Sequence, residues 1–272
     1  MESNSCQNFV LERSLKKTRV IGSFCSLTVL ALVTGLPLTA QTADQGKAPV
    51  YTYLSEWAVP RAQWPQMVKL DEQDRPLMDK LVAAGTLTGY GAYTNLIHQE
   101  GEATHGTWFT AKSEGNLLKA LEALYAQPGS TTAPVEGASK HWDYILVGRI
   151  YNQRAGKSEG GYLVGDNWDV KPGEMRAYND LMKSVLVPVY EKLLADGAIT
   201  SYGMDTEDFH TQKLGRVTFY FTTSDASGLD TASKAVDEAL DKNPALGAAF
   251  RSLVEREGHT DFLARVRYMT NK

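Results

Sequence analysis

Hydrophobic and polar positions follow the same order of patterns twice along the chain. Residues 50–57 (VYTYLSEW) alternate between apolar and polar types, and residues 162–168 do the same, which is typical of a half-buried strand. Each run precedes a segment with helical spacing that ends at a glycine, Gly85 or Gly197, where the left-handed backbone conformation closes a helix. The pattern therefore predicts a strand followed by a helix in each copy.

Each helical segment contains two prolines. Pro60 and Pro172 stand where a proline opens a helix, because it has no N–H to leave unpaired there. Pro76 and Pro188 fall inside the segments, where a proline removes a backbone hydrogen bond. Two interpretations stay open: one helix bent around a curved sheet, or two shorter helices.

A hairpin, a second helix and a closing strand complete each copy. The first copy is predicted to have strands at 86–98 and 104–111, a helix at 114–126 and a strand at 144–152. The second is predicted to have strands at 198–210 and 215–223, a helix at 228–242 and a strand at 262–270. Strand, helix, hairpin, helix, strand is the ferredoxin-like βαββαβ order.

The two copies also match residue by residue. KLVAAGTLTGYG at 80–91 and KLLADGAITSYG at 192–203 share seven of twelve residues at an offset of 112. Trp57 pairs with Trp168 at an offset of 111, and His141 pairs with His259 at an offset of 118. Small changes of offset are expected when loops gain residues and elements are kept, so the sequence predicts a tandem duplication.

A ferredoxin-like sheet carries helices on one face only, and its other face must be covered. On this order of elements, residues 50–272 resemble the dimeric α/β-barrel superfamily, in which two such units press their open sheets together. We therefore expect an α+β fold in which two repeats, 50–152 and 162–272, pack sheet to sheet as an intramolecular α/β barrel. Residues 41–49 and 153–161 are expected to be linkers. The resemblance implies cofactor-independent oxygenase or isomerase activity, or a haem-dependent enzyme.

Residues 1–40 have the features of a cleavable signal peptide. Four basic residues precede an apolar stretch, 20–38, that ends at Leu38-Thr39-Ala40, and both cysteines, Cys6 and Cys25, lie in this segment. We expect export to a periplasm or the extracellular space, with an uncleaved membrane anchor as the alternative. Cleavage would leave no cysteine for a disulfide or for thiol catalysis.

Charge and motifs exclude several classes of function. The net charge is −4 without a basic stripe, so we expect no nucleic-acid partner, and no membrane association after cleavage. Gly156-Lys157-Ser158 is not a phosphate-binding loop, because Tyr151 stands where the first glycine is required. No zinc-protease or serine-nucleophile motif is present, and no metal site is predicted. A monomer or a weak homo-oligomer is expected.

Matched aromatic and basic residues are the candidate ligand-binding set. Aromatic pairs occur at equivalent strand positions: Trp57/Trp168, Tyr90/Tyr202 and Trp108/Tyr220. They either face the space between the sheets and line a cavity, or face the helices as ordinary core. Strict alternation places the matched Arg149 and Arg267 in the space between the sheets. There they would pair with Asp205 and Glu207 or recognise an anionic ligand.

Four of the five histidines also occur as pairs. His98 and His210 lie where the second strand of each copy meets its hairpin loop. They are candidates for binding a ligand, a metal or a haem, or for acid–base catalysis, and a structural role is the alternative. His141 and His259 are each followed two residues later by an aspartate, a pattern common in local turns between side chain and backbone.

Three functions remain open on the sequence. The first is an exported protein that binds a small aromatic or carboxylated molecule between its two sheets. The second is an enzyme of the oxygenase, isomerase or haem type that the resemblance implies. The third is a non-catalytic structural or interaction protein with a filled interior. Fold alone does not choose among them.

Overall fold

The computed structural model describes residues 47–128, 140–209, 211 and 214–272. The predicted signal peptide, both cysteines and His210 therefore lie outside the described residues. Within the described part of the chain, none of the helices combines the length and the apolar character needed to cross a bilayer.

The first repeat has the predicted order of elements. It consists of β1 (Val50–Ala58), a 3₁₀ turn (Arg61–Gln63), α1 (Trp64–Ala83), β2 (Gly89–Asn95), β3 (His105–Ala111), α2 (Glu114–Tyr125) and β4 (Lys140–Gln153). Ser113 caps α2, since its side chain accepts a hydrogen bond from the amide of Asn116. The helix α1 is continuous through Pro76, so the alternative of two shorter helices is wrong for this copy.

The second repeat follows the same order with additions. It consists of β6 (Tyr162–Val170), α3 (Met175–Leu181), a π-helical turn (Met182–Leu186), α4 (Val187–Asp196), β7 (Ser201–Glu207), β8 (Arg216–Thr223), α5 (Ala226–Lys242), α6 (Pro244–Leu253) and β9 (Val254–Asn271). The π-helical turn comes immediately before Pro188, where the missing N–H disturbs the regular hydrogen bonds. Between the repeats, part of the expected linker forms a short strand, β5 (Gly156–Glu159), that pairs with β9.

Both repeats join in one closed antiparallel sheet. The strand order is β2-β3-β1-β4-β7-β8-β6-β9, and β9 pairs back onto β2 to close an eight-stranded barrel. The two seams between repeats, β4 with β7 and β2 with β9, are equivalent. The expected intramolecular α/β barrel is confirmed, and closure leaves no open edge among these eight strands.

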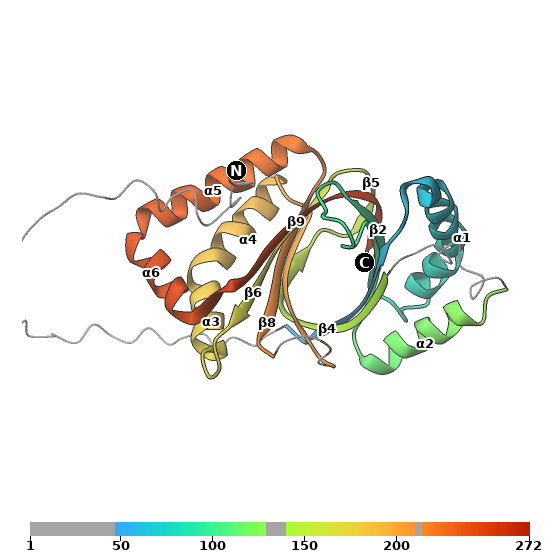
Figure 1. Cartoon of the computed structure of the whole chain (residues 1–272), viewed down its shortest axis with the longest axis horizontal. Helices are drawn as coiled ribbons and strands as arrows, with labels where there is room; N and C mark the ends of the chain where they lie inside the picture. Colours follow the sequence, from blue (N-terminus) through green and yellow to red (C-terminus); the bar gives the residue numbers. More distant parts are fainter. Residues whose placement is uncertain (1–46, 129–139, 210, 212–213) are drawn as a thin grey trace, which may run out of the picture.

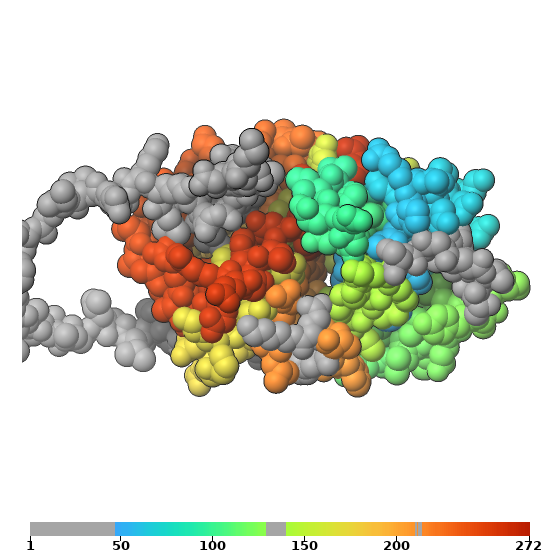
Figure 2. All heavy atoms as spheres, in the orientation of Figure 1, coloured from blue at the N-terminus to red at the C-terminus, as the bar shows by residue number. Residues whose placement is uncertain are grey.

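Strand directions show how the halves are related. Because every pair is antiparallel, β1 and β6, the first strands of the two repeats, run the same way along the barrel. The helices α1 and α2 lie on one side of the barrel and α3 to α6 on the opposite side (Figure 1). The space-filling view accordingly shows the first repeat at one end of the molecule and the second at the other (Figure 2).

Each repeat has its own apolar core between sheet and helices. In the first repeat, Leu87, Tyr90 and Leu117 are almost fully buried under α1 and α2. In the second, Tyr178 and Tyr190 pack on Phe219 and Phe250, which are contributed by β8 and the extra helix α6. The helix-facing side of the sheet is therefore filled, and open space is found on its inner side.

Candidate functional site

The inside of the barrel is hollow. One cavity of about 350 Å³ lies toward the end where β1 begins, and another of about 700 Å³ lies toward the end where β1 finishes. Six residues line both cavities and mark the middle of the barrel: Leu54, Tyr93, Leu146, Asp205, Thr218 and Phe262. We call the two cavities together the lumen.

Aromatic rings form part of the walls of the lumen. Trp108 and Tyr220, a matched pair of the duplication, lie opposite Gly91 and Gly203 on the neighbouring strands. A Cβ atom on either glycine would collide with the facing ring, so each ring lies flat over a bare backbone. The sequence requires glycine at these positions because the rings occupy the space of a side chain.

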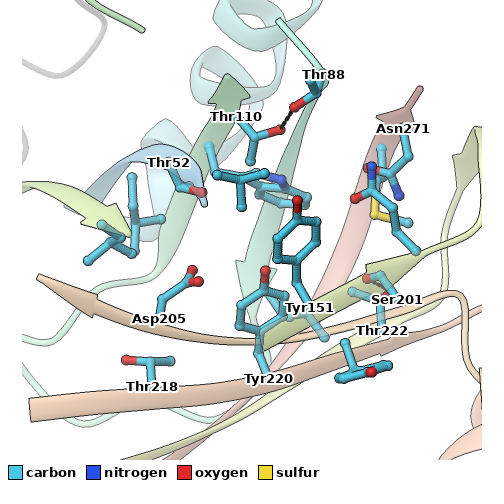
Figure 3. A pocket seen from close by; sticks show the side chains of 18 of the residues that line it. Thr52, Thr88, Thr110, Tyr151, Ser201, Asp205, Thr218, Tyr220, Thr222 and Asn271 are labelled. Carbon is cyan, nitrogen blue, oxygen red and sulfur yellow. Dashed lines mark hydrogen bonds between the residues drawn. The ribbon is translucent and has the colours of Figure 1, made fainter. Parts of the chain in front are cut away.

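One carboxyl group in the middle of the lumen has no partner for one of its oxygens. Asp205 on β7 is 4% exposed, and its Oδ1 makes no hydrogen bond among the described residues. Burial raises the pKa of this carboxyl to about 7. Its side chain points into the same space as those of Tyr151 and Tyr220 (Figure 3). An unpaired buried carboxyl is costly, so Asp205 marks a place where a ligand can be recognised.

A second buried carboxyl in the lumen is already satisfied. The Tyr93 hydroxyl donates a hydrogen bond of 2.6 Å to Glu56 Oε1. Burial raises the pKa of Glu56, and the hydrogen bond from Tyr93 opposes this effect. Glu56 and Tyr93 therefore form a closed pair on the wall.

The duplication relates these groups to one another. At the repeat offset of 112, Asp205 is equivalent to Tyr93, and at the offset of 111, Glu56 is equivalent to Asn167. Both members of each pair line the lumen. The first repeat therefore contributes a satisfied carboxyl–phenol pair, and the second contributes a carboxyl without one.

Polar side chains surround the end of the lumen where β1 begins. The hydroxyls of Thr88 and Thr110 are 2.9 Å apart, and their repeat equivalents Thr200 and Thr222 are 2.7 Å apart (Figure 3 shows the first pair). The opposite end is lined by acidic groups, including Glu207 and Asp143, and by Arg216. The two ends therefore differ in charge.

Three of the six matched aromatic residues face the helices and do not line the lumen. Trp57 packs with Met67 of α1, and Trp168 packs edge-on against Phe250 of α6. Tyr90 donates a hydrogen bond to Asp79 of α1. Tyr202 makes the equivalent bond to Glu191 of α4, although it also borders the lumen. Trp57, Trp168 and Tyr90 therefore pack on the helix-facing side of the sheet, as the alternative interpretation had it. The third pair, Trp108 and Tyr220, lines the cavity.

The two matched arginines do not face the lumen as strict alternation predicted. Arg149 and Arg267 are the extra residues of equivalent β-bulges, opposite β7 and β2 respectively. Arg149 is exposed, and Arg267 pairs with Asp71 of α1. A bulge reverses the alternation that follows it, so Leu146 and Tyr151 both line the lumen despite their odd spacing. The expected partners of the arginines, Asp205 and Glu207, are therefore not used by them.

The histidines lie mainly outside the lumen. His98 is exposed, with its ring edge-on to Trp64 at 6.3 Å, and its repeat partner His210 is outside the described residues. His141 and His259 stack on Trp57 and Trp168, respectively. Their aspartates, Asp143 and Asp261, contact the imidazole directly, which corrects the expected local turns to the backbone.

A histidine-ligated haem does not fit the groups inside the barrel. Haem iron takes an axial ligand such as histidine. Among the described residues that line the lumen, the one histidine is His141 at the rim. Its Nε2 already lies 2.9 Å from Ser55 Oγ and 3.0 Å from Asp143 Oδ1.

Comparison with known proteins identifies the fold and no specific family. No protein-family profile and no curated protein matches the sequence. A candidate monooxygenase from Lactobacillus acidophilus is similar in structure, with a TM-score of 0.59, 11% identity, and coverage of 83% of this chain and 97% of that one. A candidate monooxygenase from Fusobacterium nucleatum has a TM-score of 0.60 and 12% identity, and the match covers 83% of this chain and 95% of that one. An anthrone oxidase-like protein has a TM-score of 0.53 and 13% identity, and the match covers 83% of this chain and 94% of that one. The chain thus has the dimeric α/β-barrel fold within a single polypeptide.

Proposed function

We propose that the lumen binds one small aromatic molecule whose polar group meets Asp205. The observation that carries the proposal is a cavity of about 350 Å³ with aromatic walls and one buried carboxyl oxygen that lacks a hydrogen bond. Sites for small molecules typically combine apolar walls with few polar groups that fix orientation. A purely structural role would leave both the hollow interior and the unsatisfied oxygen without a reason.

Calorimetric titration with 1-naphthalenemethanol, a neutral aromatic alcohol, tests this proposal. We expect one molecule to bind per chain, and we expect Leu146→Trp to abolish binding by filling the middle of the lumen. Arg149→Trp is the matched control, because position 149 is on the same strand and exposed. Binding that survives in L146W, or is lost equally in R149W, would place the ligand elsewhere.

Native mass spectrometry of protein purified from its own host addresses the natural ligand. A retained small molecule in the wild type that is missing from L146W would support the lumen as its site. An identical adduct in both proteins would argue against it.

A second candidate function is oxygenation of the bound aromatic molecule without a cofactor. Two observations favour it: a buried carboxyl whose pKa is raised to about 7 inside the cavity, and a fold shared with candidate monooxygenases and an anthrone oxidase-like protein. A carboxylate with a pKa near neutrality suits a general base. Asp205 would accept a proton from an acidic C–H group of the substrate, and the resulting carbanion would add O₂ to form a carbon-bound peroxide. Return of the proton and loss of water from the hydroperoxide would give a ketone, so that anthrone and O₂ become anthraquinone and water.

Oxygen consumption in the presence of anthrone tests this candidate. If Asp205 is the base, Asp205→Asn should lower the protein-dependent rate by about 100-fold or more. Asp196→Asn, a change at an exposed residue of α4, should leave the rate unchanged. A rate that is the same with and without the protein would exclude this activity on anthrone.

A further inference from the structure

Four carboxyl groups and three basic side chains are the charged groups that line the lumen. Glu56, Asp205 and Glu207 line it, and Asp143 lies at the rim. The facing basic groups are Arg216, Lys112 and Lys272. The charge that a ligand would meet depends on which of these groups already have a partner in the protein.

Two of the basic groups are engaged away from Asp205. Arg216 Nε lies 2.8 Å from Asp169 Oδ1, and its Nη2 donates to the carbonyl of Gly258 at 3.0 Å. Lys272 Nζ donates to the carbonyl of Val82 in α1. Lys112 is exposed just beyond the end of β3. None of these cations compensates the buried carboxyl in the middle of the lumen.

The other carboxyl groups already accept hydrogen bonds. Glu56 accepts from Tyr93, and Glu207 accepts from the hydroxyl and the amide of Thr211. Among the buried side-chain atoms of the described residues, Asp205 Oδ1 is the carboxyl oxygen of the lumen that makes no hydrogen bond. The site thus presents a buried carboxyl group whose Oδ1 lies next to Gly148 of β4, and the rings of Tyr93, Trp108, Tyr220 and Phe262 line the same cavity.

Building on the proposed function, we propose that the ligand is an arylalkylamine, an aromatic ring that carries an aliphatic amine, whose protonated nitrogen binds between Asp205 and these rings. A cation gains from a carboxylate through a charge-assisted hydrogen bond. It also gains from the negative faces of aromatic rings. An anionic ligand would instead place like charges together in a water-poor interior.

Competing cations fit the site less well. A divalent metal ion such as Ca²⁺ or Mg²⁺ takes six or more oxygen ligands, and the aromatic walls do not supply them. An amine without an aromatic ring would form the ion pair but would leave the ring-lined walls without contact. The raised pKa of Asp205 is consistent with a buried carboxyl group that lacks a cationic partner. A bound cation would favour the ionised form of this carboxyl group.

Three probes of one size separate the ligand classes: 1-naphthylmethylamine, 1-naphthalenemethanol and 1-naphthoate, titrated calorimetrically at pH 8. We expect the amine to bind at least about tenfold more tightly than the alcohol, and the naphthoate to bind most weakly. Asp205→Asn should abolish the difference between amine and alcohol. Asp196→Asn, which removes an exposed carboxylate and changes the net charge equally, should preserve it.

The outcomes distinguish this inference from the proposed function. If the alcohol or the naphthoate binds as tightly as the amine, the inference is overturned and binding in the lumen stands. If the amine is preferred equally in D205N, the inference is likewise overturned, because another group recognises the charge. If no probe binds, the proposed function fails and the inference fails with it.

Discussion

The two repeats build the same niche around a stacked histidine and tryptophan and give it different charge. In the first, His141 stacks on Trp57 at 3.3 Å and contacts Ser55 and Asp143. In the second, His259 stacks on Trp168 at 3.8 Å. There its Nε2 lies 2.8 Å from Asp261 and 3.7 Å from Asp166, the equivalent of Ser55.

One difference between the repeats, Ser55 in the first and Asp166 in the second, reverses the direction in which the histidine pKa is shifted. Burial lowers the pKa of His141, and Asp143 opposes this only in part. Burial acts in the same direction on His259, but hydrogen bonds and charges from Asp166 and Asp261 outweigh it and raise the pKa to about 9. The duplicated backbone thus fixes the stacking, and a single residue decides whether the imidazole is charged at neutral pH.

The largest contrast between the repeats is expected at the matched arginines. Arg267→Met should lower the free energy of unfolding by about 3–5 kcal/mol, because it leaves the buried Asp71 unpaired. Arg149→Met should change it by less than about 0.5 kcal/mol, because Arg149 is exposed. Urea denaturation of both variants at pH 8 measures the difference.

Acid should partly restore the Arg267 variant. Burial already raises the pKa of Asp71 to about 6 with Arg267 present, and removal of the cation should raise it further. Most of the carboxyl should then be protonated at pH 5, so the loss of stability should be smaller at pH 5 than at pH 8. Equal losses at both pH values would show that Asp71 stays ionised.

The charged histidine niche should make stability depend on pH. The folded-state pKa of His259, about 9, lies above its ordinary value of 6.5, so its stabilisation is complete below pH 6.5 and is lost as pH rises through 9. Between pH 7 and 9.5 this amounts to about 2–3 kcal/mol. Asp166→Ser, which copies the first repeat, should remove most of this dependence in urea denaturation. An unchanged pH profile would assign the dependence to other groups.

Glycine at the helix ends gives a smaller contrast. Gly85 and Gly197 have φ values of +76° and +85°, so alanine at either position should cost about 1–2 kcal/mol in backbone strain. Gly197→Ala should cost more, because its Cβ would approach the Arg154 guanidinium that binds the carbonyl of Leu194, whereas no atom lies within 4 Å of a Cβ at position 85. Thermal unfolding of the two variants gives the order.

The smallest effect is expected from converting the first niche into the second. Ser55→Asp should raise the pKa of His141, because it adds a second carboxylate beside the imidazole, with a stability change below about 1 kcal/mol because the niche is partly open to water. Titration of the imidazole C–H resonance by NMR measures it. Ser55→Asn, which adds similar bulk without charge, should leave the pKa nearly unchanged.

The repeat made the fold predictable, and the change of offset between the copies also located an insertion in the second copy. Identity at fixed offsets gave the order of elements, the closing glycines and the packing of one repeat against the other. The increase of the offset from 112 to 118 indicated an insertion before the last strand, and α6 (Pro244–Leu253) forms there. The predicted signal peptide and export stay predictions.

The residues that line the lumen were harder to predict, because a strict alternation of inward and outward side chains does not account for a β-bulge. One extra residue at Arg149 and at Arg267 reverses which side chains point inward beyond it. Two signals were nevertheless present in the sequence. Gly91 and Gly203 recur opposite Trp108 and Tyr220, and the inward position that holds Tyr93 in the first copy holds Asp205 in the second.

The covalent connection of the two repeats affects the number of equivalent orientations that a ligand can take in the lumen. A homodimer with the same barrel would carry every inward residue twice, so a ligand could bind in two equivalent directions. Here the connection through 153–161 permits an acid on one wall and a phenol on the other. Any molecule that enters the lumen would therefore meet two different walls, and a single chain presents a chamber without two-fold symmetry.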